Sequence, residues 1–188
     1  MATRLAKWIG MMLLAVLLPA RGEIGSEGGR SMYFRGRLDP GAAPNEPCVL
    51  DIEIEEIMFK LNSFKDKYKV VRIRVENGRK ELLKLSAEKD AIELELSDGK
   101  TVRGTFNLQA QDGPIWDTLD ESMRKALAYP LSIRGAKGDD PNGRRPEVVH
   151  LFAFFPSEKV TGLPRAFSYM IQSVGKTVRI VQPPPTAN

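Results

Sequence analysis

The chain has 188 residues, with 28 basic and 24 acidic side chains, one histidine and one cysteine. Its hydrophobic content of 42% is too high for a disordered chain, and its length suits one domain of ordinary size with short extensions. A single cysteine excludes a framework of intramolecular disulfides.

The N-terminus has the pattern of an export signal. Arg4 and Lys7 are followed by an uncharged run from Trp8 to Ala20, which is 13 residues long. A helix that crosses a bilayer needs about 20 residues, so the run is short for a membrane span. Small residues stand at the −3 and −1 positions of a cut after residue 22. We expect residues 1–22 to be a signal peptide and the protein to be periplasmic or secreted, with an uncleaved anchor or a cytosolic helix as alternatives.

Loss of this segment changes the charge of the protein. The first 22 residues hold three basic residues and no acidic one, so the remaining chain has 25 basic and 24 acidic residues, a net charge of +1. A nearly neutral chain gives no electrostatic reason to expect nucleic acid as a partner. Membrane contact is expected only through the signal segment, if it stays uncleaved.

Composition divides the rest of the chain into three parts. Residues 23–47 are rich in Gly and Pro and read as a flexible linker, in which Met32–Phe34 is able to dock as a short edge strand. The domain is expected at 48–182. Residues 183–188 form a proline-rich tail, because consecutive prolines continue neither a helix nor a strand ladder.

Three segments alternate apolar and polar residues with a period of two: 50–55, 71–76 and 92–97. This pattern is typical of strands with one buried and one exposed face. Asn77-Gly78 closes the second segment, and Asp98-Gly99 after the third is the strongest hairpin signal in the chain.

The C-terminal third continues this pattern. Residues 148–155 are apolar on both faces apart from His150, which predicts a central strand covered on two sides. Residues 166–172 and 177–181 read as a final hairpin.

One segment has helical spacing instead. In residues 114–128 the apolar side chains recur every four positions, with acids early and bases late, and Pro130 follows. We expect one short amphipathic helix that crosses between two sheets and covers an open end of the core.

Together these elements predict an all-β fold, an antiparallel immunoglobulin-like sandwich with one short helical insertion and about seven to nine strands. A closed barrel is the alternative. On the exposed face, the acids of segment 50–55 are expected beside Arg72 and Arg74 of the next strand.

The chain resembles the immunoglobulin-like sandwich domains of bacterial exported proteins, of the secreted immunoprotective-antigen type. The resemblance covers roughly residues 48–182 and depends on a V-x-V-x-V-x-N-x-G-like strand, a D-G hairpin and a late Phe-Pro step. These positions are Val71, Ile73, Val75, Asn77, Gly78, Asp98, Gly99, Phe155 and Pro156. The helix at 114–128 departs from that pattern. The resemblance implies no catalytic residues.

Few residues suggest chemistry. His150 lacks partner motifs for a metal site or a triad, and a Cys48–His150 nucleophile pair has no supporting signature. Both residues are interpreted as structural. The polar loop 135–146 carries Asp139, Asp140 and Asn142, whose oxygens suit Ca²⁺, but its spacing fails the EF-hand pattern and a solvated loop is the better interpretation.

Four side chains are candidates for contact with a partner. Trp116 and Tyr129 are aromatic residues near the ends of the expected helix, although Trp116 is better interpreted as a core lid under it. Arg144 and Arg145 lie in the polar loop and suit a carboxylate or phosphate on a partner.

The sequence therefore favours a non-catalytic exported module that binds an envelope or extracellular protein or has a structural role at the cell envelope. It predicts no catalytic, metal-binding or cofactor-binding residues. The alternative is a small metal-dependent or hydrolytic secreted enzyme.

Overall fold

The computed structural model describes residues 30–38, 48–136 and 146–184. The expected signal peptide and most of the polar loop lie outside these residues. Eight strands form the main sheet: β1 (Ser31–Arg37), β2 (Cys48–Glu55), β3 (Tyr68–Asn77), β5 (Ala91–Leu96), β6 (Thr101–Gly104), β8 (Glu147–Pro156), β9 (Pro164–Ile171) and β10 (Lys176–Val181). The short strands β4 (Leu83–Lys84) and β7 (Ser132–Ile133) pair separately. The helices are α2 (Glu56–Leu61), α3 (Leu108–Gln111), α4 (Gly113–Asp117) and α5 (Glu121–Leu127), with 3₁₀ turns η1 (Ser157–Lys159) and η2 (Gln172–Val174).

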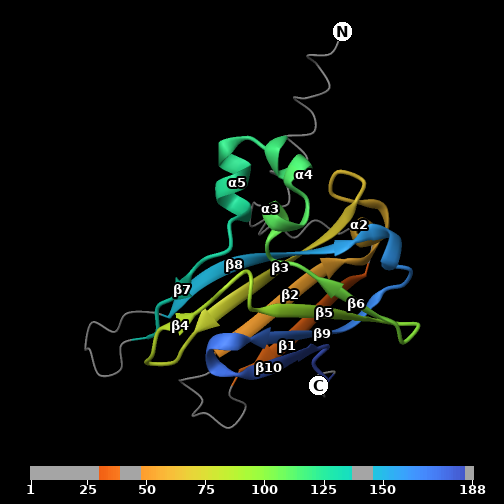
Figure 1. Ribbon diagram of the computed structural model, residues 1–188. Coiled ribbons are helices and arrows are strands. Elements are labelled where there is room, and N and C mark those ends of the chain that lie inside the picture. Colours follow the sequence, from red (N-terminus) through yellow and green to blue (C-terminus); the bar gives the residue numbers. More distant parts are fainter. Residues whose placement is uncertain (1–29, 39–47, 137–145, 185–188) are drawn as a thin grey trace, which may run out of the picture.

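The main sheet is antiparallel and nearly closed. Its strand order is β6-β5-β9-β10-β1-β2-β3-β8, and the edge strands β6 and β8 approach each other at a bridge between Thr105 and Phe154 (Figure 1). The expected antiparallel β class is thus confirmed. The two-sheet immunoglobulin-like sandwich is not confirmed, because all eight strands belong to one barrel-like sheet.

This sheet consists of two well-paired halves with sparse pairing between them. One half is β1-β2-β3-β8 and the other is β6-β5-β9-β10. Between the halves, β1 and β10 share a single register pair, Arg35 with Val181, and β6 meets β8 only through the isolated bridge that follows it. By contrast, β3 and β8 pair along their whole length, from Tyr68 with Pro156 to Asn77 with Glu147.

A glycine lies at each of these two junctions. A Cβ on Gly36 in β1 would lie 2.8 Å from the Arg179 carbonyl oxygen in β10, and a Cβ on Gly104 in β6 would lie 2.6 Å from the Phe155 ring in β8. Both glycines therefore allow a close approach that a side chain would prevent.

The alternating segments form the predicted strands. Inward-facing residues such as Ile52, Ile73 and Leu94 are fully buried in one core, while their neighbours along each strand face outward. Gly99, with φ of +84°, lies in the tight connection between β5 and β6, as the Asp98-Gly99 pair predicts.

Strand β1 lies inside the stretch that we expected to be a linker. It is an inner strand between β10 and β2 rather than a short edge strand. Phe34 is completely buried and packs edge-on against Phe167, with ring centroids 5.2 Å apart. The alternation of Met32 and Phe34 with Tyr33 and Arg35 is the local signal, which the surrounding Gly and Pro residues obscure.

Strand β8 is covered on both faces only over its C-terminal half, because Val148 and His150 on its outer face are exposed, and it is not the central strand that its sequence predicts. It is the last strand in the sheet order. Its inner face packs in the main core, and on its outer face Phe152 and Phe154 pack in a second apolar cluster under the helices. The helices, and not a neighbouring strand, explain the apolar pattern.

The expected single helix at 114–128 is divided, and it lies elsewhere. Helices α4 and α5 occupy this region, α3 precedes them, and the group stands over the outer face of β8 rather than at an open end of the core (Figure 1). Each helix begins at its own capping side chain: Asn107, Asp112 and Asp120 accept hydrogen bonds from the backbone N–H groups of Ala110, Ile115 and Met123. Asp120 is thus a cap that starts a new helix, not an early acid within a continuous one.

The charged face of the sheet contains one of the expected pairs, that of Asp51 with Arg74. Asp51 lies opposite Arg74 in the β2–β3 register, with 3.4 Å between carboxylate and guanidinium, and it also pairs with Arg35 at 2.7 Å. Burial alone would raise the pKa of Asp51, but hydrogen bonds from Arg35 and Tyr33 outweigh it and hold the pKa below its usual value. These ion pairs fix the outer register of the β1-β2-β3 half.

Candidate functional site

At the junction between β6 and β8 the sheet is closed by a single bridge. Thr105 and Phe154 exchange two backbone hydrogen bonds, each 2.9 Å long. The next antiparallel pair in one direction would be Arg103 with Pro156, but proline has no N–H to donate. In the other direction the chain leaves the strand at Asn107, which caps α3. The sequence therefore limits this closure to one bridge.

The bridge also determines which backbone groups of β8 are unpaired. Because the Phe154 N–H and C=O point toward β6, those of Val148, His150 and Phe152 point to the same edge. No backbone hydrogen bond joins these three residues to another part of the described chain along that edge. Unpaired strand edges of this kind accept additional strands from partners.

A cleft of about 360 Å³ lies beside the bridge. Its aromatic lining comes from Tyr68, Phe106 and Phe154, on three different elements of the chain. Its charged lining consists of Glu88, Asp90, Arg103 and Lys159. This volume is within the range of ligand-sized clefts, and the mixed lining suits a partner with both apolar and charged groups.

The two cations of the cleft are unpaired within the described chain. Neither the Arg103 guanidinium nor the Lys159 ammonium has an ion pair there, although Glu93 lies opposite Arg103 in the β5–β6 register. The neighbouring acid Glu95 pairs instead with Arg165 and Arg179. Arg103 and Lys159 are both exposed, so they are free to meet an anionic group on a ligand.

A buried polar cluster borders the cleft. The Asp90 carboxylate accepts hydrogen bonds from the Tyr129 hydroxyl at 2.7 Å and from the backbone N–H groups of Gln172 and Ser86 at 2.9 and 3.0 Å. The hydroxyls of Tyr129 and Tyr169 also bond to each other. This cluster ties the β4–β5 connection, the segment after α5 and strand β9 together.

The electrostatics of this cluster favour a structural role. Burial, with the nearby Asp90 charge, raises the pKa of both Tyr129 and Tyr169 far above that of a free phenol. The hydroxyls therefore stay protonated as hydrogen-bond donors. A phenolate nucleophile does not form here near neutral pH.

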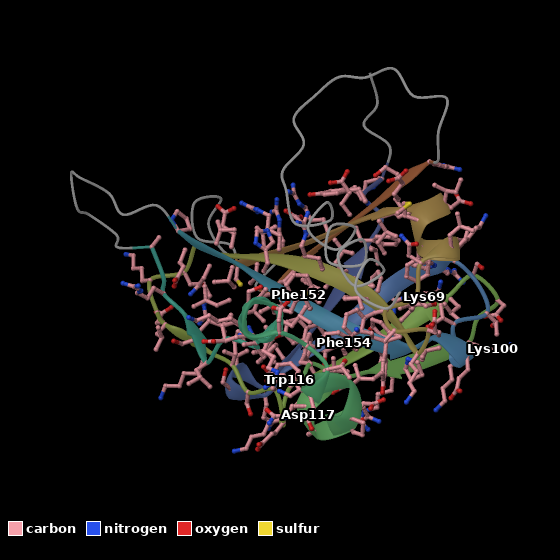
Figure 2. All side chains as sticks on the ribbon, turned by 90° about the horizontal axis from the view of Figure 1, so that it is seen from above. Lys69, Lys100, Trp116, Asp117, Phe152 and Phe154 are labelled. Atoms are coloured by element: carbon pink, nitrogen blue, oxygen red, sulfur yellow. The ribbon has the colours of Figure 1, made fainter. Side chains whose placement is uncertain are left out.

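The two expected contact residues that the structure describes, Trp116 and Tyr129, belong to different apolar clusters. Trp116 is half-buried and packs with Phe152 and Phe154 in the cluster under the helices, consistent with a core lid (Figure 2). Tyr129 turns inward to Asp90 and packs against the main core. Arg144 and Arg145 lie outside the described residues, as do Asp139, Asp140 and Asn142.

The remaining candidate pair is not assembled. Cys48 is completely buried in the core, whereas His150 is exposed on the outer face of β8. The Cys48–His150 hypothesis is therefore wrong. Within residues 30–38, 48–136 and 146–184, no group of three or more His, Cys, Asp or Glu side chains is placed to hold a metal ion.

Sequence reasoning missed the residues that line the cleft. Tyr68, Arg103 and Lys159 are far apart in the chain, and each alone looks like an ordinary strand or turn residue. From the sequence, Pro156 is interpreted only as part of the Phe-Pro step. In the structure, its missing N–H prevents the β6–β8 bridge from extending beside the cleft.

Comparisons with models of protein families, with curated proteins and with solved structures found no match. None of the helices in the described part of the chain combines the length and the apolar character needed to cross a bilayer.

Proposed function

We propose that this protein is an exported, non-catalytic module that binds a protein of the cell envelope or extracellular space through the cleft beside the β6–β8 bridge. The observation that carries the proposal is the pair of exposed cations, Arg103 and Lys159, which line that cleft without an ion pair in the described chain. Exposed cations next to aromatic side chains are a common basis of recognition.

A protein partner fits this surface better than a free small molecule. The unpaired backbone edge of β8 continues from the bridge that borders the cleft. An extended segment of a partner gains main-chain hydrogen bonds along such an edge and side-chain contacts in the adjoining cleft.

From the immunoglobulin-like resemblance, the proposal keeps only a β-sheet module with two faces. The two halves of the sheet, joined by one register pair and one bridge, support a module with two faces. The single continuous sheet gives no support to a true two-sheet sandwich, so the proposed binding does not depend on that identity.

The test compares three versions of the full chain, expressed in cells and cross-linked to their neighbours. The cleft variant carries Arg103→Glu and Lys159→Glu, and a charge-matched control carries Lys84→Glu and Lys125→Glu, both exposed and outside the cleft lining. We expect one protein to be enriched by the natural chain and the control, and to be reduced about tenfold by the cleft variant, a loss of roughly 1.4 kcal/mol.

Equal enrichment by all three versions would contradict binding at the cleft. Absence of the chain from both the envelope fraction and the medium would contradict export. Hydrolysis of an ester, peptide or glycan panel, abolished by one substitution, would instead establish the enzyme alternative.

A further inference from the structure

Helix α2 exposes its apolar side chains instead of burying them. Ile57, Met58 and Leu61 are 47%, 40% and 72% exposed, and their spacing places them on one face of the helix. Only Phe59 of this six-residue helix is buried. A surface helix normally turns its apolar stripe toward the core, so this orientation is reversed.

The orientation of α2 is fixed by contacts on its inner side. The Lys69 ammonium, which is nearly buried, donates hydrogen bonds to the carbonyl oxygens of Phe59, Lys60 and Asn62 at 2.6, 3.0 and 3.1 Å. It also lies 5.7 Å from the centre of the Phe59 ring. Figure 2 shows Lys69 beside the helix. With Phe59 and Lys69 holding this side, the apolar face cannot roll inward without breaking these bonds.

The N-terminal part of the chain joins the fold beside this face. The described chain begins at Arg30, whose carbonyl oxygen accepts a 3.1 Å hydrogen bond from the N–H of Glu56, the first residue of α2. The uncharged run that ends at Ala20 is separated from Arg30 by nine residues. The ten Cα–Cα steps from Ala20 to Arg30 span at most about 36 Å even when fully extended, so a membrane that retains the run lies within that reach of the start of α2.

We propose that α2 is a membrane-contact face, with Ile57, Met58 and Leu61 seated in the interfacial region of a lipid bilayer. An interfacial helix places its apolar side chains among the headgroups and upper acyl chains, and it needs no spanning length. This extends membrane contact beyond the N-terminal segment. It rests on the anchor alternative for residues 1–22, in which the uncharged run is retained in a membrane, and not on partner binding at the cleft.

The test places an environment-sensitive NBD fluorophore on single introduced cysteines in the full chain. Leu61→Cys reports on the α2 face, and Leu131→Cys is the matched control, since Leu131 is an equally bare apolar side chain at 82% exposure beside β7. The native Cys48 is completely buried, and the unsubstituted chain checks that it takes up no label. Each labelled chain is mixed with vesicles of phosphatidylcholine and phosphatidylglycerol, with or without brominated acyl chains.

We expect the probe at residue 61 to shift its emission to shorter wavelength and to be quenched by brominated lipid, while the probe at residue 131 does neither. Water-like emission at residue 61, or the same response at both positions, would overturn the proposal. A shift at residue 61 without quenching by brominated lipid would also overturn it, because that result indicates contact with protein. Loss of partner capture by the cleft variant is measured separately, so the two proposals fail independently.

Discussion

His150 shows how one exposed side chain couples the fold to pH. It lies opposite Arg74 in the β3–β8 register, and Arg72 is two residue pairs further along, opposite Phe152. Partial burial, together with these two guanidinium groups, lowers the pKa of His150 below its usual 6.5. The imidazole is thus neutral in the folded protein at pH values where it would be charged in the unfolded chain.

This shift predicts a loss of stability in acid. Below about pH 6.5 the unfolded chain binds a proton at residue 150 more readily than the folded chain, so acidification favours unfolding. The expected loss is below about 1 kcal/mol, because the imidazole is exposed and water screens both arginines. His150→Gln should therefore make the urea midpoint fall less between about pH 8 and about pH 5. His150 is the sole histidine of the chain, so the comparison isolates it, and an unchanged pH profile would contradict the argument.

At the scale of elements, α2 is held by the buried side chain of Lys69 in addition to its own Phe59. The carbonyl groups of Phe59 and Lys60 in α2, and that of the C-cap residue Asn62, accept hydrogen bonds from the Lys69 ammonium, which adds to the cap bond from the Asn62 N–H to Met58. Burial lowers the pKa of Lys69, so the bonds to these carbonyl groups are what compensate the charge for its lost hydration.

Replacing Lys69 by Met keeps the length of the side chain and removes the donors. The carbonyl groups of Phe59, Lys60 and Asn62 then lose a partner, and we expect the free energy of unfolding to fall by about 1–3 kcal/mol. Chemical denaturation measures this loss, with exposed Lys125→Met on α5 as the control that should change little. Equal effects of the two substitutions would show that Lys69 does not hold the helix.

The helical insertion shows that local sequence signals identify a helix and its buried face, but not the surface of the sheet on which the helix packs. The recurrence of Ile115, Leu119 and Leu127 correctly identifies residues that face the protein, since all three are buried in the cluster over β8. The same spacing does not reveal that the chain restarts at Asp120, or that the cluster lies on the outer face of the sheet. The capping residues can be recognised in the sequence, whereas the surface against which the helices pack is determined by the tertiary structure.

At the scale of the molecule, the single β6–β8 bridge predicts an alternating pattern of protection along β8. The amides of Val149 and Leu151 face β3 and are paired, while those of Val148 and His150 face the open edge. We expect hydrogen exchange by NMR to be fast at Val148 and His150, slow at their two neighbours, and slow again at Phe154, which bonds to Thr105. Uniform protection from Val148 to Phe154 would mean that another segment completes the edge.

Features that depend on neighbouring residues could be predicted from the sequence, whereas features that depend on distant parts of the chain could not. Alternation of apolar and polar residues is local, so the strands β2, β3 and β5 are predictable from it, and the continuous apolar run that predicts β8 is equally local. The order of the strands is not local, and it alone decides whether the chain forms two layers or one curled sheet. The cleft depends on that order, because Tyr68, Arg103 and Lys159 meet only after β3, β6 and the turn after β8 converge.

The missing amide hydrogen of Pro156 also has an evolutionary consequence. In the register of the Thr105–Phe154 bridge, Pro156 would be the partner of Arg103, and it has no N–H to donate. A residue with an amide hydrogen at position 156 would remove this obstacle to a second bridge, and a second bridge would narrow the cleft without changing the charged side chains that line it. If the cleft holds a partner segment as proposed, mutation of one codon would then adjust the size of that segment independently of the charges that it meets.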